Sequence, residues 1–196
     1  MTDLERVKID SSMIIFVKDK TPEICLTAVK QNGLVLKYIK EQTPEICLEA
    51  VRQDHWALRF VKQQTRELCL LAVKRNGRTI EYVKEQTPEI CLEAVKQNGD
   101  ALQYVKKKTY EICLAAVKES GQALSFVPTL HQTFELCLAA VNQYGIALRY
   151  VKNQTPEICL AAVENFPDSI RYVKDPICLN AIRKQHPELI AILLCS

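Results

Sequence analysis

The chain has 196 residues, of which 48% are hydrophobic and 25% charged, so it is long enough for one sizeable core or one elongated array of repeats. Its formal net charge of +3 is too small to require nucleic acid or an anionic membrane as a partner. The polar start MTDLERVKIDSS is unlike a secretory signal, and no apolar run approaches the roughly 20 residues of a membrane helix. Nine cysteines in such a chain favour free thiols in a reducing, intracellular compartment, and no membrane is expected as a partner.

One phrase of about 22 residues recurs along the chain. The threonine that opens it recurs at steps of 22 residues, with one step of 24, as Thr21, Thr43, Thr65, Thr87, Thr109, Thr133 and Thr155. A truncated unit (1–20), regular repeats (21–174) and a degenerate last unit (175–196) make about nine units. No Pro-, Gly- or Ser-rich linker separates them, so the sequence predicts a single helical-repeat domain over 1–196.

Each repeat is predicted to open with a helix, as residues 87–97 illustrate. Thr87 is a good N-cap, and Pro88 suits the first helical position. The apolar residues within 90–95 cover roughly 200° of the helix surface, which predicts burial on two sides. We expect Gly99 to end this helix in the left-handed conformation that glycine adopts readily.

A second, shorter helix is predicted to follow, with Ala101, Leu102, Tyr104 and Val105 on one face. Helices this short are not stable alone in water, so each pair must bury its faces against its neighbours. The sequence therefore predicts an all-α fold, an α-solenoid of helix–turn–helix repeats. A leucine-rich repeat has a similar period, but the apolar spacing here is helical and the Thr-Pro-Glu start is typical of a helix.

The one irregular step falls at SFVPTLHQT, residues 125–133, which carries two extra residues and Pro128. Proline cannot continue a helix, so we expect the short helix to end early here and the connection to lengthen.

A cysteine stands four positions after nearly every repeat threonine. The members of this set are Cys25, Cys47, Cys69, Cys91, Cys113, Cys137, Cys159 and, after a shortening, Cys178. A metal ladder, a disulfide ladder and reactive thiols are the functional alternatives. Neighbouring helices pack ~8–10 Å apart, beyond the ~7 Å Cα limit for a disulfide, and no C-x-x-C pair occurs. We therefore interpret these cysteines as small buried hydrophobic residues; Cys195, outside the register, is the one candidate for a reactive thiol.

The sequence contains no recognisable catalytic motif. There is no Gly-rich phosphate loop, H-E-x-x-H, G-x-S-x-G or cysteine–histidine arrangement with ligand spacing. The recurring Glu and Lys residues are repeated in equivalent places, whereas a catalytic site needs one asymmetric cluster. We expect no enzyme activity, no catalytic or metal-binding residues and no cofactor.

Two rows of residues repeat at the end of the second helix. An aromatic row includes Tyr82 and Tyr104, and core packing is favoured for it over base stacking. A row of cations follows it, and its members are candidate polyanion-binding residues: Lys18, Lys40, Lys62, Lys84 and Lys106. Complementing the helix dipole and keeping the chain soluble is the favoured explanation of such cations, so nucleic acid is an unfavoured but open alternative.

Positions that differ between repeats are the better candidates for recognition, because solenoids bind partners through such surface positions. Trp56 is the only tryptophan, and it occupies such a position after Asp54-His55, where Asn-Gly is usual. Trp and Arg are favoured as interface anchors. The candidate partner-binding residues are Trp56, Arg59, Arg78, Arg149 and Arg171. The alternative for Trp56 is that it simply folds back onto the neighbouring helix.

The phrase TPEICLEAVKQNGxALxYVKxQ resembles an uncharacterised tandem-repeat family, a domain of unknown function found in large DNA viruses of amoebae and in some bacteria that live inside host cells. The resemblance covers 21–174. It implies a helical array and an intracellular setting, either the cytoplasm, including that of an infected host cell, or a virion. It supplies no activity and no binding residues.

These observations together predict a non-catalytic scaffold for protein–protein interaction, in a viral or host-interacting context and with an unidentified protein partner. A polyanion binder is the first alternative. A self-assembling component is the second, with the apolar C-terminal unit, 175–196, as the interface of a homo-oligomer.

Overall fold

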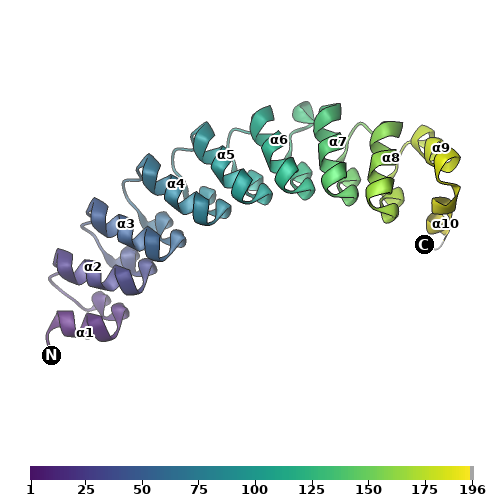
Figure 1. Ribbon diagram of the computed structural model, residues 1–196. Helices are drawn as coiled ribbons and strands as arrows, with labels where there is room; N and C mark the ends of the chain where they lie inside the picture. Colours follow the sequence, from purple (N-terminus) through teal and green to yellow (C-terminus); the bar gives the residue numbers. More distant parts are fainter. Residues whose placement is uncertain (195–196) are drawn as a thin grey trace. The chain divides into compact units, whose positions relative to one another are not determined.

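The computed structural model describes residues 1–194, in which consecutive α-helices are separated by one or two short 3₁₀ helices (Figure 1). The α-helices are α1 (Asp3–Ile9), α2 (Pro22–Gln31), α3 (Pro44–Gln53), α4 (Arg66–Arg75), α5 (Pro88–Gln97), α6 (Tyr110–Glu119), α7 (Phe134–Gln143), α8 (Pro156–Asn165), α9 (Pro176–Gln185) and α10 (Ile190–Leu194). The 3₁₀ helices are η1 (Ser11–Ile15), η2 (Gly33–Tyr38), η3 (His55–Phe60), η4 (Gly77–Tyr82), η5 (Gly99–Tyr104), η6 (Gly121–Phe126), η7 (Thr129–His131), η8 (Gly145–Tyr150), η9 (Pro167–Tyr172) and η10 (Pro187–Leu189). None of the residues 1–194 forms a strand, so the predicted all-α repeat fold of about nine units is confirmed.

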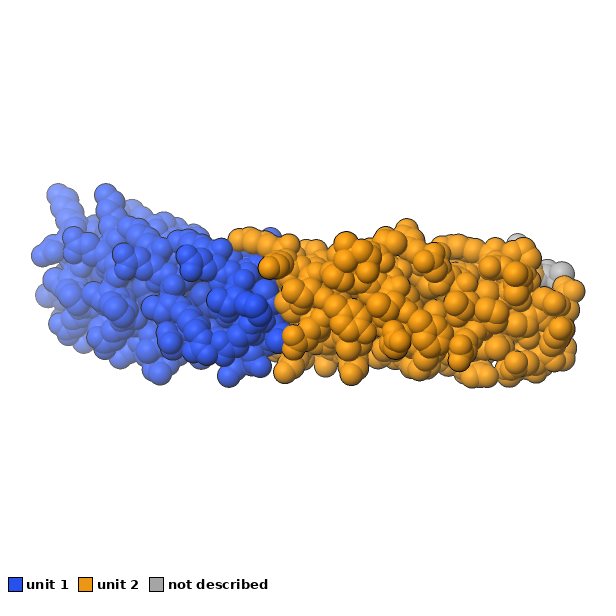
Figure 2. Space-filling view, turned by 90° about the horizontal axis from the view of Figure 1, so that it is seen from above, with its two compact units in different colours: residues 1–94 blue, residues 95–196 orange. Residues whose placement is uncertain are grey.

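The chain divides into two units, Met1–Ala94 and Val95–Ser196, and the division falls inside α5 (Figure 2). In the first unit α2 packs against α3 and α3 against α4, with η2, η3 and η4 in contact in the same order. In the second unit α6, α7, α8 and α9 pack one against the next. Within each unit, therefore, consecutive repeats support one another through contacts between neighbouring helices.

The repeat threonine caps the α-helix as the sequence predicts, and where proline follows it, as in α2, α3, α5 and α8, proline is the first helical residue. The hydroxyl of Thr43 accepts a hydrogen bond from the Ile46 backbone N–H at 3.3 Å, and Thr87 does the same for Ile90 at 3.3 Å. Such a cap satisfies a backbone donor that the helix leaves without a partner, and it stabilises a helix by about 1 kcal/mol.

The second helix of each repeat is a 3₁₀ helix, which the sequence pattern did not distinguish from a short α-helix. The side chain of Asn98 caps it by accepting from the Asp100 N–H at 3.0 Å. Ala101, Leu102 and Val105 are buried, whereas Tyr104 is only half-buried. With three residues per turn, Gly99 and Leu102 lie one above the other, and both are buried, so the tighter helix still presents one edge to the core. Val105 follows this helix as its extended C-cap.

The prediction that the repeat glycine adopts a left-handed conformation is wrong, because no glycine in residues 1–194 has a positive φ. The close approach of the next repeat explains the glycine instead. A Cβ on Gly99 would lie 2.5 Å from the carbonyl oxygen of Ala116, and a Cβ on Gly145 would lie 2.5 Å from that of Ala162. Glycine at this position therefore allows consecutive repeats to touch.

The insertion at 125–133 does not shorten the preceding helix, contrary to the expectation from Pro128. Helix η6 has the same six residues as η5, and the added residues form the short turn η7. Because proline stands after the helix rather than within it, no helical hydrogen bond is lost.

Glutamine side chains join consecutive repeats by a set of hydrogen bonds that sequence reasoning missed. The amide oxygen of Gln42 accepts from the Lys62 N–H at 2.9 Å, and its amide nitrogen donates to the Phe60 carbonyl at 3.0 Å. The same pair of bonds to the following repeat is made by Gln64, Gln132 and Gln154. We call these residues the junction glutamines.

A second set of amides acts at the other end of the α-helices. The Gln53 side chain accepts from the Gly33 N–H at 2.6 Å and donates to the Gln31 carbonyl at 3.1 Å. Gln143 and Asn165 make the corresponding bonds in the second unit. Both ends of an α-helix are thus tied to the preceding repeat, and the apolar core lies between the ties.

Candidate partner-binding surfaces

Trp56 and Arg59 lie together on η3, against the aromatic ring of the next repeat. The half-buried indole of Trp56 meets the Tyr82 ring edge-on, with ring centres 5.8 Å apart. The guanidinium of Arg59 lies 4.7 Å from the centre of the Phe60 ring and 5.9 Å from that of Tyr82. Trp56 thus packs onto η4 of the next repeat, which is the alternative stated for it above. Arg59 is exposed beside it. We call Trp56, Arg59, Phe60 and Tyr82 the η3–η4 surface.

Arg78 is exposed on η4, at the position of its repeat that Trp56 holds in the preceding one. Its backbone N–H donates to the Asn76 side chain at 3.0 Å, and the Asn76 amide lies 3.3 Å from the imidazole of His55. Because η3 and η4 are in contact, Arg78 continues the row of variable positions that contains Trp56.

The second unit repeats the guanidinium–aromatic arrangement with Arg149. This guanidinium lies 4.9 Å from the centre of the Tyr150 ring and 5.8 Å from that of Tyr172. Arg171 is instead 3.3 Å from the carboxylate of Asp168 in its own helix. Thus Arg149 is the counterpart of Arg59, whereas Arg171 makes an ion pair within its own repeat.

Two lysines of the candidate polyanion row have a structural contact that sequence reasoning did not foresee. The Lys62 ammonium donates to the Lys40 carbonyl at 2.6 Å, and the Lys84 ammonium donates to the Lys62 carbonyl at 2.6 Å. Lys18 and Lys106 are exposed at the same register. Donation to a neutral carbonyl leaves the positive charge of each ammonium intact, and an ammonium has three donors, so Lys62 can still donate to solvent or a ligand.

The eight repeat cysteines are buried free thiols, which confirms their interpretation as small core residues. Burial raises the pKa of the thiols of Cys69, Cys113 and Cys137 to about 11. Thiolate is the nucleophilic form, so these cysteines are poor nucleophiles at neutral pH. Cys195, the candidate for a reactive thiol, lies outside the described residues.

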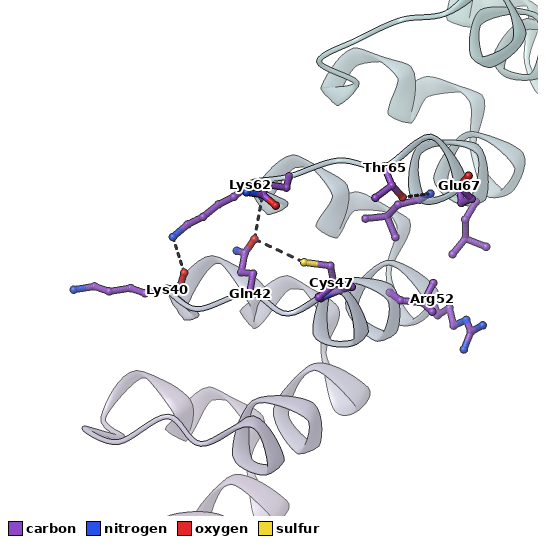
Figure 3. Close-up of a pocket in the computed structure, with 12 residues that line it drawn as sticks. Lys40, Gln42, Cys47, Arg52, Lys62, Thr65 and Glu67 are labelled. Carbon is purple, nitrogen blue, oxygen red and sulfur yellow. Dashed lines mark hydrogen bonds between the residues drawn. The ribbon is translucent and has the colours of Figure 1, made fainter.

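A groove of about 640 Å³ lies between α3 and α4 in the first unit (Figure 3). Pro44, Leu48 and Arg52 line it from α3, and Glu67, Leu68 and Leu71 line it from α4. Lys40 and Lys62 lie beside the start of these helices at one end, where Gln42 also accepts from the thiol of Cys47 at 3.8 Å. We call this feature the α3–α4 groove.

Neither a metal site nor a membrane-spanning helix is found among the described residues. Across residues 1–194, no three His, Cys, Asp or Glu side chains gather in an arrangement that could hold a metal ion. Every helix in the same range falls short of the length and hydrophobicity that a membrane span requires.

Comparison with known proteins identifies the repeat. The family model described as "Domain of unknown function (DUF4116)" matches five overlapping pairs of repeats, at 21–64, 43–87, 65–109, 87–132 and 109–155. Searches of the curated proteins and of the solved structures gave no significant match. The matches cover more than half of the chain and follow the repeat period found in the sequence. The chain therefore belongs to the DUF4116 family of tandem helical repeats.

Proposed function

We propose that this chain is a non-catalytic scaffold that binds a protein partner inside a cell, through the η3–η4 surface. Stacked repeats offer an extended surface on which variable residues are held by an invariant core. The buried free thiols are in keeping with a reducing compartment.

The observation that carries this proposal is the position of Arg59 close to two aromatic rings. Its guanidinium lies over Phe60 and near Tyr82, while the indole of Trp56 contacts the same tyrosine. These contacts restrict the side chains before any partner arrives, so less conformational entropy is lost on binding. Aromatic and arginine side chains held in this way are typical of interface anchors.

Affinity capture from host-cell lysate tests the proposal, with the wild type, Trp56→Ala, Arg59→Ala and a matched control. Gln103→Ala is the control, because Gln103 is exposed at the position of η5 that Arg59 holds in η3. We expect at least one protein to be retained by the wild type and the control and lost with both surface variants. If every captured protein is retained by all four chains, the η3–η4 surface is not the binding site.

Two further measurements separate the alternative functions. Retention on heparin or DNA that weakens steeply with salt would favour a polyanion binder that uses Lys18, Lys40, Lys62, Lys84 and Lys106. Light scattering on the chain with and without residues 188–196 tests self-assembly through the C-terminal unit. A monomer in both cases would exclude a homo-oligomer.

A further inference from the structure

The α3–α4 groove exists at the one regular junction whose glycine is replaced by histidine. At the other junctions described above, glycine allows the α-carbon to approach an alanine carbonyl of the next repeat so closely that a Cβ would overlap with it. His55 carries a Cβ and an imidazole at this position, facing Ala72 of α4 by the repeat register. A wider spacing at this junction agrees with the packing, since α3 and α4 pack less closely than α2 and α3.

A second replacement at the same junction has the same effect. Gln53 draws its repeat toward the preceding one by accepting from the Gly33 N–H. Arg75 occupies the corresponding position of α4, and a guanidinium has no acceptor to offer. It donates instead to the carbonyls of Arg52 and Val51. The junction is thus bridged by a longer side chain, which suits a wider spacing.

One wall of the groove carries an apolar side chain at a position where other repeats have a polar or a small one. Leu71 lies on its α4 wall, whereas the same register position holds Thr27, Glu49 and Glu93 in α2, α3 and α5 and alanine in α6, α7 and α8. Leu48 faces the groove from α3. Both leucines are half-buried, so they can still bury apolar surface against a ligand.

The charged residues of the groove fall into two groups, two that lie beside a charge of opposite sign and two lysines at one end. Arg52 is 3.0 Å from Glu49, and Glu67 is 4.0 Å from Arg66, so each of these lining charges already has a neighbour of opposite sign. The ammonium groups of Lys40 and Lys62 lie at the end nearest the helix N-termini, and both side chains are exposed. A ligand that carries an anionic group next to an apolar group would complement the two lysines and the two leucines of the groove.

We propose that the α3–α4 groove binds an extended acidic peptide segment of a protein partner, with an aliphatic side chain between Leu48 and Leu71 and a carboxylate at Lys40 and Lys62. A ten-residue helix such as α3 is about 15 Å long, which matches four or five extended residues. The rim, which includes Pro44, Arg52, Lys62 and Glu67, is exposed. A peptide can therefore keep its backbone in water while it buries one side chain. This inference rests on the proposed function, since it assumes a protein partner.

Selection from a phage-displayed library of random heptapeptides on the full wild-type chain tests the proposal. The enriched peptides should carry Asp or Glu close to Leu, Ile or Phe. Their synthetic, fluorescein-labelled forms should bind the wild type at least tenfold more tightly than Leu71→Glu in fluorescence anisotropy. Glutamate occurs naturally at this position in α3 and α5, so this variant should fold, and circular dichroism checks that it does.

Thr27→Glu is the matched control, because it makes the same change of charge at the same position of α2, outside the groove. It should keep wild-type affinity. His55→Gly is the second test: it removes the side chain that separates the repeats, so the groove should close and affinity should fall at least tenfold.

Three results would overturn the proposal. These are an absence of enrichment, enriched peptides without acidic residues, and equal effects of Leu71→Glu and Thr27→Glu. Binding of decanoate that Leu71→Glu abolishes, without any enriched peptide, would likewise reject a peptide and assign the groove to a small amphipathic acid. If capture from lysate depends on Trp56 while no acidic peptide binds, the groove inference alone fails and the proposed function stands.

Discussion

The amide oxygen of Gln64 accepts a hydrogen bond from the backbone N–H of Lys84, 2.9 Å away in the next repeat. The amide nitrogen of the same side chain donates to the Tyr82 carbonyl at 2.9 Å. One side chain thus satisfies a backbone donor and a backbone acceptor that have no helical partner of their own. The junction glutamines are therefore structural residues, although they stand in a polar stretch of the sequence.

Replacing a junction glutamine should destabilise the array. Gln64→Ala leaves the Lys84 N–H and the Tyr82 carbonyl to water, and we expect a loss of about 1–2 kcal/mol in the free energy of unfolding. The adjacent Gln63→Ala is the control and should change stability by less than about 0.5 kcal/mol. Urea unfolding followed by circular dichroism measures both, and equal midpoints for the two variants would contradict the role of Gln64.

A Cβ at Gly99 should destabilise the array, whatever the conformational preference of the new residue. Gly99→Ala places a Cβ 2.5 Å from the Ala116 carbonyl oxygen, so repeats must separate, at a cost of about 1–3 kcal/mol. Gly99→Asn is the informative companion, because asparagine is accepted at left-handed positions. Thermal melts should show both variants destabilised, and a wild-type melting temperature for Gly99→Asn would restore the left-handed explanation.

The buried thiols should make stability fall at high pH. Burial raises the pKa of Cys113 from the ordinary 9.0 to about 11, so the folded state keeps a proton that the unfolded chain releases. The stability linked to this group is complete below about pH 9 and is lost as the pH rises from 9 toward 11. Melting temperatures at pH 7, 9 and 10 measure this effect.

Cys113→Ser isolates one thiol in that experiment. Serine does not ionise in this range, so the variant should lose about 1–3 kcal/mol at pH 7, because a hydroxyl is buried, but decline less steeply above pH 9. Parallel pH profiles for the wild type and the variant would show that Cys113 does not contribute.

Substitutions of the threonine that caps α6 should reduce stability by different amounts, depending on whether the hydroxyl is kept. Thr109→Ala removes the acceptor of the Ile112 N–H and should cost about 1 kcal/mol, whereas Thr109→Ser should retain most of the stability. Urea midpoints of the two variants test this, and equal losses would indicate that the threonine methyl group, not its hydroxyl, is what matters.

Much of the fold could be predicted because the same local sequence pattern for a helix recurs in each repeat. Thr87 and Pro88 mark a helix start by chemistry that needs no tertiary information, and the cysteine lies within an apolar arc wide enough to require burial. The tertiary arrangement decided the rest. Gly99 was assigned to a left-handed turn from local preference, whereas its role is a contact with Ala116, 17 residues later.

The candidate site was predictable only in part. Trp56 and Arg59 stood out because they vary, but their shared contact with Tyr82 depends on how η3 meets η4. The α3–α4 groove was missed because it arises from spacing between repeats. A signal was present in the sequence: His55 in a glycine position, followed by Arg75 where glutamine or asparagine is more usual.

The junction glutamines also bear on how such chains change in length over evolutionary time. Each junction glutamine makes this pair of hydrogen bonds with the backbone of the following repeat, and the pair involves no more distant repeat. Duplication or deletion of a whole 22-residue module inside the array would recreate the same amide bridges at the new boundary. Selection can therefore lengthen or shorten the protein one module at a time. A junction altered by substitution, such as the one at His55, can acquire a recognition site without any change at the remaining junctions.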